Sequence, residues 1–232
     1  MSSSKRPASR TGERLILLLA LIWFALLCNR GLNLSEEGWH LLRGLELTLG
    51  KITFRDYYSH LAPLGFMIQA ALLKIFGLHL LVGRIYVLVQ GVIAVAIALR
   101  LGRRHLAPPY SLVPALIIIF YSASLGGFPH YNVDSSFFLF IALALLDHYL
   151  GKPRAPAAFF AGLFVAAAAL SRQTSLLPGL AIILTAFSLV RVRVPAGRLA
   201  AHVAVCGLGL ALPALAVSAF LAYHHALFET WQ

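Results

Sequence analysis

Seven long runs of apolar residues constrain this 232-residue chain more than any other feature. A helix needs about 20 mostly apolar residues to cross the ~30 Å hydrocarbon core of a bilayer. Because lipid offers no partner to an unpaired backbone amide, such runs must be helical. We therefore predict an all-α integral membrane protein with about seven transmembrane helices, over residues 15–34, 80–101, 110–126, 133–150, 155–171, 174–190 and 199–223.

The composition supports this class. Hydrophobic residues make up 60% of the chain and charged residues 12%, whereas a soluble domain is about half apolar and a quarter charged. These proportions exclude a disordered chain, a collagen-like chain and a small disulfide-stapled secreted module.

The basic residues are distributed by side rather than gathered into one patch. Twelve of the 19 Lys and Arg residues fall in the N-terminal tail 1–14 and after the second, fourth and sixth predicted spans. The positive-inside rule places that side in the cytoplasm. Six of the eight acidic residues fall on the opposite, outer side. The net charge of +11 is thus a topology signal, and we expect a cytoplasmic N-terminus and no nucleic-acid partner.

Residues 33–79 are predicted to form a long outer loop that contains interfacial helices. Within it, residues 63–76 are apolar over 14 positions and end near Lys74. This stretch is too short to cross comfortably, so we expect a helix lying in the outer interface. If it crossed, every later loop would change side and the arginine-rich loops would face outward, against the charge rule.

Three acidic residues are candidates for chemistry at the outer surface. Glu36 and Glu37 follow the first span, and Asp134 begins the fourth. On one interpretation the Glu pair is a solvated helix boundary, and Asp134 stabilises a helix dipole by ~0.3–1 kcal/mol. On the other, these carboxylates serve as a general base or as metal ligands.

Two arginines and one polar segment are candidates for ligand binding. Arg172 lies in a very short turn between two apolar runs, and Arg84 lies inside the start of the second span. Each either snorkels to the interface or binds a phosphate, which a guanidinium matches bidentately. Asp56, Tyr57 and His60 precede the interfacial helix, where they belong either to an aromatic belt or to a binding site.

Taken in order, these segments resemble the C-type integral-membrane glycosyltransferases. That superfamily includes the dolichyl-phosphate-mannose protein mannosyltransferases, the aminoarabinose lipid A transferases and many bacterial relatives. The resemblance runs from about residue 13 to 225 and rests on the order and sidedness of residues 36–40 (EEGWH), 55–58 (RDYY), 63–64 (PL), 132–134 (NVD) and 162–174.

The resemblance implies sugar transfer from a polyprenyl-phosphate-linked donor to an acceptor at the outer face of a bacterial cytoplasmic membrane. Glu36 matches the catalytic base, which is usually Asp, and Glu37 lies beside it. Asp134 matches a second outer acid, so Asp134 and Glu37 are candidate ligands of a divalent metal ion. Arg172 matches a basic position expected to meet the lipid phosphate, with Arg84 in support.

Family members usually continue beyond the matched seven-span module with more spans and an outer domain, so we expect a truncated gene or a fragment. Two alternatives stay open. One is a non-catalytic paralogue that binds the lipid carrier or a membrane partner. The other is a transporter of a lipid-linked substrate, which is disfavoured because the inner halves of the spans offer little beyond Asp147 and His148.

Overall fold

The computed structural model describes residues 10–29, 31, 33–122 and 127–227. Within that part the regular structure is helical, with no named strand. Two short 3-10 turns, Tyr110–Leu112 and Gln173–Ser175, precede α5 and α8. The α-helices are α1 (Arg10–Cys28), α2 (Glu37–Thr48), α3 (Leu64–Phe76), α4 (Leu80–His105), α5 (Val113–Ser122), α6 (Tyr131–Gly151), α7 (Ala155–Ser171), α8 (Leu176–Val190) and α9 (Ala196–Tyr223).

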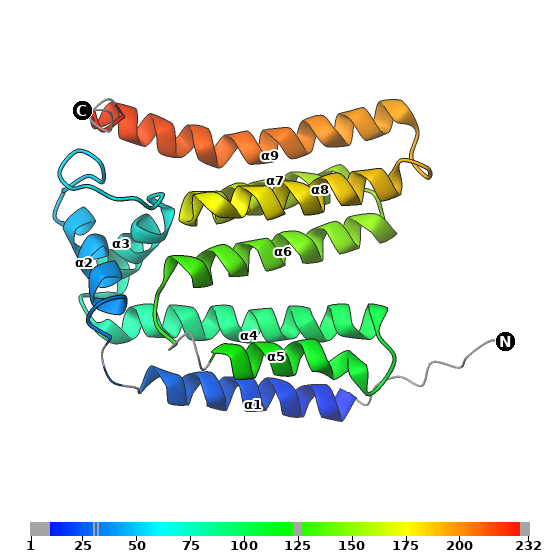
Figure 1. The fold of residues 1–232 in the computed structure, drawn as a ribbon, viewed down its shortest axis with the longest axis horizontal. Helices are drawn as coiled ribbons and strands as arrows, with labels where there is room; N and C mark the ends of the chain where they lie inside the picture. The colour runs from blue at the N-terminus through cyan, green and yellow to red at the C-terminus, as the bar shows by residue number, and fades with distance from the viewer. Residues whose placement is uncertain (1–9, 30, 32, 123–126, 228–232) are drawn as a thin grey trace.

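The long helices run side by side and alternate in direction, while α2 and α3 lie together across one end of the bundle (Figure 1). We call this the α2–α3 end. The opposite end, where α4, α6 and α8 finish, is the arginine end. Its Lys and Arg residues whose side chains the structure describes are Arg14, Arg100, Arg103, Arg104, Lys152, Arg154, Arg191, Arg193 and Arg198.

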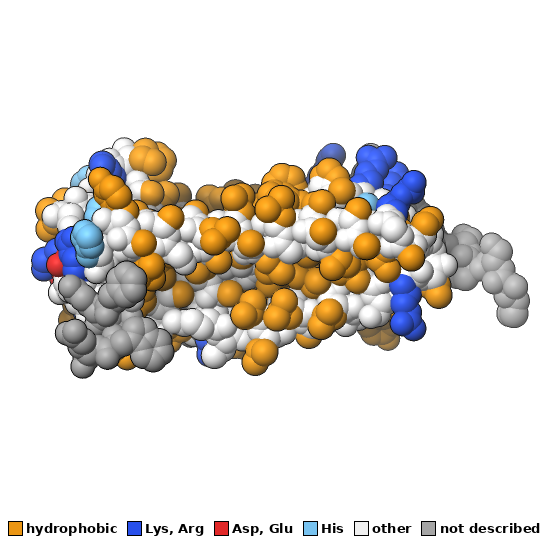
Figure 2. Space-filling model, turned by 90° about the horizontal axis from the view of Figure 1, so that it is seen from above, with side chains coloured by type: hydrophobic (Ala, Val, Ile, Leu, Met, Phe, Trp, Pro, Cys, Tyr) orange, Lys and Arg blue, Asp and Glu red, His pale blue; other side chains and the backbone are white. Residues whose placement is uncertain are grey.

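Five helices in the described part are long and apolar enough to cross a membrane, namely α1, α4, α6, α8 with its preceding turn, and α9. The apolar helices α3, α5 and α7 are shorter. Figure 2 shows apolar side chains along the length of the bundle, with Lys and Arg gathered mainly towards its ends. This distribution is that of a multi-pass membrane protein, because its sides match hydrocarbon and its ends match water.

Each of the seven predicted runs contains a helix, although the boundaries differ. The first run was expected to continue to residue 34, but α1 ends at Cys28, before Asn29 and Gly31, residues that favour helix ends. The helix also begins at Arg10, inside the stretch predicted as a tail. The predicted tail residues 1–9, the end of the third run at 123–126 and the terminal 228–232 lie outside the described residues.

The two larger hydrophobic cores of the described chain each hold one half of the bundle together. One lies among α1, α4 and α5 and includes Phe24, Val95 and Ile119. The other lies among α6, α7, α8 and α9 and includes Val165 and Phe187. The two halves meet mainly along α4 and α6. Side chains at the start of α6 can therefore contact both halves.

The closest helix pair in the second half is α7 with α9, and glycines permit it. A Cβ atom at Gly162 would overlap the carbonyl oxygen of Cys206, and one at Gly209 would overlap the carbonyl oxygen of Phe159. Small residues at such a crossing let two backbones approach closely in a membrane.

Substituting Gly209→Ala is therefore expected to destabilise the protein by about 1–3 kcal/mol, because the added methyl forces α7 and α9 apart. Gly207→Ala is the matched control on the same helix, since a Cβ there meets no atom within 4 Å. The midpoint of thermal unfolding in detergent micelles measures the difference. Equal midpoints for the two variants would contradict the close α7–α9 contact.

Candidate functional site

Four chain segments converge at the α2–α3 end. They are the start of α2, the loop that precedes α3, the start of α6, and the turn between α7 and α8. The predicted candidates Glu36, Asp134 and Arg172 lie on three of these segments. The fold thus brings together side chains that are up to 136 positions apart in the sequence.

Glu36 is paired with a histidine that the sequence analysis did not single out. Its Oε2 lies 3.0 Å from Nε2 of His130, in the loop that enters α6. The Glu36 side chain is 47% exposed, whereas that of His130 is 13% exposed. The carboxylate is therefore accessible from outside the protein and held in place by a largely buried ring.

The hydrogen bonds of His130 fix its tautomer. Nδ1 accepts a hydrogen bond from the backbone N–H of Asn132 at 3.1 Å, which caps α6. Nε2 must then carry the proton and donate it to Glu36. Burial lowers the pKa of His130 below its usual value, against the opposing charge of Glu36. A neutral imidazole thus orients the Glu36 carboxylate, whose other oxygen, Oε1, has no hydrogen-bond partner among the residues that the structure describes.

Arg172 lies beside this pair. It is the residue that ends α7, and its Nη1 donates to Oδ1 of Asn132 at 2.6 Å. The positive charge of Arg172 contributes to the lowered pKa of His130. The next residue, Gln173, donates from Nε2 to the carbonyl oxygen of His60 at 3.1 Å. The α7–α8 turn is therefore tied both to α6 and to the loop before α3.

Asp134 lies beneath the surface rather than on it. The residue is 1% exposed, and Oδ1 accepts from Nε2 of Gln90 on α4 at 2.9 Å. A Cβ atom on Gly65 of α3 would lie 3.2 Å from Oδ2 of Asp134. The neighbouring Ser135 hydrogen-bonds to the hydroxyl of Ser175. Asp134 therefore joins α3, α4 and α6 under the exposed Glu36–His130 pair.

Glu37 and Arg84, both predicted to act on a ligand, are paired with each other. Nε of Arg84 donates to Oε1 of Glu37 at 2.6 Å, and Nη2 donates to Oε2 at 2.7 Å. Their side chains are 1% and 6% exposed. Arg84 also donates to the carbonyl oxygens of Cys28 and Gly31. This buried ion pair fixes α2 against α4 and the end of α1.

The predicted metal ligands do not fit a metal ion in this arrangement. Both carboxylate oxygens of Glu37 accept from Arg84, and one oxygen of Asp134 accepts from Gln90. Among the described residues, no group of three His, Cys, Asp or Glu side chains is placed to hold one ion.

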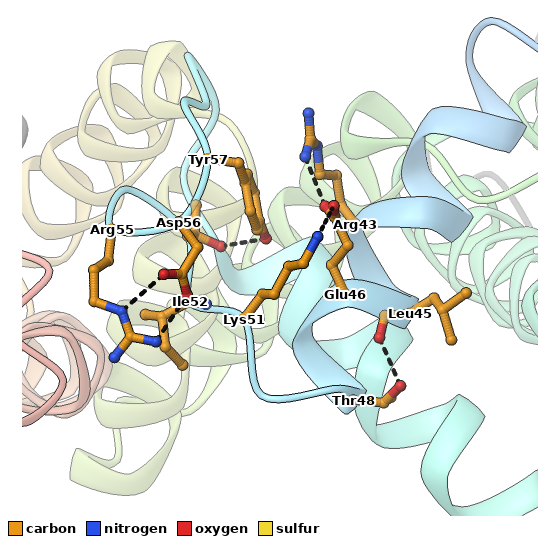
Figure 3. Close-up of polar contacts among 10 residues, drawn as sticks. Arg43, Leu45, Glu46, Thr48, Lys51, Ile52, Arg55, Asp56 and Tyr57 are labelled. Atoms are coloured by element: carbon orange, nitrogen blue, oxygen red, sulfur yellow. Dashed lines mark hydrogen bonds and ion pairs between the residues drawn. The ribbon is translucent and has the colours of Figure 1, made fainter.

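Asp56 and Tyr57 stabilise the loop between α2 and α3 (Figure 3). Asp56 accepts from the Ile52 amide at 2.6 Å and pairs with Arg55, and these bonds hold its pKa below the usual range. Tyr57 hydrogen-bonds to Thr53. In the described part of the chain, neither Asp56 nor Tyr57 hydrogen-bonds to the other candidate residues.

The same loop rests on α2 through a cation–π contact. The guanidinium of Arg43 lies 4.2 Å from the centre of the Tyr57 ring and pairs with Glu46 at 2.6 Å. The His60 ring stacks on Trp39 of α2, with 6.0 Å between ring centres. The His60 side chain is exposed. Of Asp56, Tyr57 and His60, it is His60 that contacts the Arg172 turn, because its backbone carbonyl accepts the hydrogen bond from Gln173.

An apolar groove of about 260 Å³ runs between the two halves next to Asp134. Its walls include Phe24 of α1, Ile118 of α5, and Val133 and Phe137 of α6. Gln90 lines the groove and also donates to Asp134. Since Val133 is one turn along α6 from His130, the groove begins close to the exposed pair.

No protein-family model matches the chain, and no curated protein or solved structure matches it. The chemistry of the site is therefore inferred from its own residues and their geometry. His130, Asn132 and Gln90 are not among the candidate residues predicted from the sequence, although Asn132 belongs to the segment 132–134 that carries the resemblance. The one available signal was their position: His130 and Asn132 flank a predicted helix start next to Asp134, and Gln90 is a polar residue inside a predicted span.

The buried His40 makes the stability of the folded protein depend on pH. It lies in α2, and burial, together with the nearby His130, lowers its pKa from 6.5 to about 4. Between pH 4 and pH 6.5, His40 therefore binds a proton in the unfolded chain but not in the folded protein. Stability that is complete above pH 6.5 is lost as the pH falls towards 4. We expect a loss of about 2 kcal/mol between pH 7 and pH 5.

Unfolding midpoints in micelles at the two pH values, for the wild type and for His40→Gln, measure this effect. The variant is expected to lose most of the pH dependence. An equal acid sensitivity in both proteins would show that His40 is not the responsible group.

Proposed function

We propose that this chain transfers a sugar from a polyprenyl-phosphate-linked donor to an acceptor at the outer face of a bacterial cytoplasmic membrane. The single observation that carries the proposal is the exposed Glu36 carboxylate, which a neutral His130 orients beside Arg172. A base and a phosphate-binding cation are the two groups that this reaction needs.

The proposal includes a topology with seven membrane crossings and a cytoplasmic N-terminus. The alternating directions of α1 and α4–α9 support it, as do the nine described basic residues at the arginine end. A bilayer adapts to helices as short as α5 and α7 by thinning locally. In this topology α2 and α3 lie in the outer interface, and the Glu36–His130 pair faces outward.

In the proposed mechanism, Oε1 of Glu36 accepts the proton of an acceptor hydroxyl while the oxygen of that hydroxyl attacks the anomeric carbon of the donor sugar. The bond from that carbon to the phosphate oxygen breaks, and the electron pair leaves with the polyprenyl phosphate. This single displacement inverts the anomeric centre. His130 keeps the Glu36 carboxylate oriented, because its Nε2–H donates to the oxygen that does not react.

Arg172 stabilises the charge that develops on the leaving phosphate. Its hydrogen bond to Asn132 directs the guanidinium towards the start of α6. The groove that begins at Val133 accommodates the first isoprenoid units of the donor. Glu37 and Arg84 take a positioning role in this account, since each neutralises the other beneath the site.

Binding of the lipid carrier tests the proposed role of Arg172. Arg172→Gln is expected to weaken binding of polyprenyl phosphate about tenfold or more, the effect of losing one charge-assisted contact of ~1.5–3 kcal/mol. Arg154→Gln, at the arginine end, is the matched control and is expected to bind normally. Microscale thermophoresis in micelles measures both. Equal affinities would remove Arg172 from the phosphate site.

A non-catalytic protein that binds the lipid carrier would show the same effect of Arg172→Gln on binding, but it would show no turnover. The orientation of Glu36 by a neutral histidine favours catalysis over this alternative, because binding alone has no use for an exposed base aimed by a second side chain.

A further inference from the structure

A second groove lies at the opposite end of the bundle, away from the proposed transfer site. It has a volume of about 460 Å³ and lies between α4, α5, α6 and α8, within the ~300–1,000 Å³ typical of ligand pockets. Its walls include the apolar side chains Leu106, Pro114, Leu143, Leu146, Ile182 and Leu189. This groove separates the two hydrophobic cores at the arginine end.

The mouth of the groove carries a cluster of one arginine, one histidine and one aspartate. Asp147 of α6 lines the groove, and its side chain is 8% exposed. Its Oδ2 pairs with Nη1 of Arg104 at 2.8 Å, and Oδ1 lies 2.7 Å from Nε2 of His105. The side chains of Arg104 and His105 are 39% and 56% exposed. Asp147 thus holds two basic side chains at the mouth while they remain accessible.

The surroundings of the mouth are strongly basic. Nine Lys or Arg residues whose side chains the structure describes lie at the arginine end, whereas the described acids there are Glu13 and Asp147. Glu13 pairs with Arg103, and Asp147 with Arg104. The charge at this end therefore favours an anion.

We propose that this groove binds one acyl chain of an anionic phospholipid, with the lipid phosphate placed against Arg104 and His105. The occupant follows from two features. The rim residues Leu143 and Leu189 are 39% and 56% exposed on candidate membrane-spanning helices, so the groove opens to hydrocarbon. The mouth of the groove also lies at the arginine end, where Lys and Arg outnumber the acids, and basic pockets between membrane helices match anionic headgroups.

The bound lipid has a structural consequence. Because its chain fills the space between α4–α5 and α6–α8, it adds contacts between the two halves of the bundle. The anionic lipid therefore stabilises the folded protein by mass action, and the stabilisation grows with the logarithm of the lipid concentration above the dissociation constant. This site is independent of the proposed sugar transfer, so either can fail without the other.

The test uses the full chain in a non-ionic detergent, titrated with phosphatidylglycerol or phosphatidylcholine of identical acyl chains. Native mass spectrometry counts the lipids retained, and thermal unfolding measures the stabilisation. We expect a preference for phosphatidylglycerol of about fivefold for each basic side chain that faces the headgroup, and we expect it to decrease at high salt.

Two variants and two matched controls locate the site. Leu189→Trp fills the groove at a partly exposed position and is expected to lose retention of both lipids. Arg104→Gln is expected to lower the preference for the anionic lipid by about fivefold. Leu184→Trp, on the same helix but outside the groove, and Arg193→Gln, at the same end, are expected to behave as wild type.

Three results would overturn the proposal. The first is equal retention of the two lipids by the wild type. The second is a Leu189→Trp variant that folds and still retains phosphatidylglycerol as the wild type does. The third is a mass corresponding to two copies of the chain in place of a lipid adduct, which would assign the groove to self-association.

Discussion

Replacing Glu36 by Gln is expected to abolish sugar transfer while the protein still folds and inserts. The amide keeps the size of the side chain but cannot accept the proton of the acceptor hydroxyl. Loss of a positioned general base lowers rates by about 10²–10⁴-fold. Because Glu36 is 47% exposed, little folding energy depends on it. The rate of incorporation of radiolabelled sugar into a membrane extract, supplied with the polyprenyl-phosphate donor, measures the effect.

Glu46→Gln provides the control, because it is the same substitution further along α2, and Glu46 contacts Arg43 and Lys51 rather than the proposed site. His130→Ala is expected to give a smaller loss than Glu36→Gln, since the carboxylate remains but is no longer oriented. A Glu36→Gln variant with wild-type rates would remove Glu36 from the mechanism.

Removing one partner of the buried Glu37–Arg84 pair is expected to give the largest loss of stability. The two side chains are 1% and 6% exposed, so the partner left behind is a buried, uncompensated charge. Breaking such pairs costs about 3–5 kcal/mol. Arg84→Met should therefore lower the unfolding free energy by roughly that amount, as measured by denaturant titration in mixed micelles.

The double variant Glu37→Gln/Arg84→Met is expected to recover much of this loss, because no unpaired charge remains. Arg103→Gln is the matched control. It breaks the pair with Glu13, where Arg103 is 47% exposed, and exposed pairs contribute about 0–1 kcal/mol. A double variant as unstable as the sum of its two single variants would contradict the coupling.

Hydropathy predicted the long helices well because a bilayer imposes a minimum length and forbids unpaired backbone groups. All seven apolar runs contain a helix, and the short run at 63–76 forms α3 (Leu64–Phe76). The α2 helix was not delimited in advance. Its apolar residues alternate irregularly with Arg43 and Glu46, because it packs on α3 at one face and pairs charges at another.

The candidate site was predictable only in part. The sidedness of the spans placed Glu36, Asp134 and Arg172 at one end, and the structure places them there. From the sequence, Glu36 and Glu37 are both predicted as catalytic residues, because they are adjacent and nothing distinguishes their side chains. Successive residues at a helix start point in different directions. One side chain therefore meets His130 near the surface, and the other meets Arg84 in the interior.

The most direct test of the central claim is turnover by the purified chain. Wild-type protein and Glu36→Gln, each reconstituted in liposomes, are supplied with polyprenyl-phosphate-linked sugars and an extract of membrane acceptors. Mass spectrometry then counts the polyprenyl phosphate that is released. We expect several releases per wild-type molecule and none above background for the variant. Equal release from the two proteins, or none from either with every donor sugar, would contradict the claim.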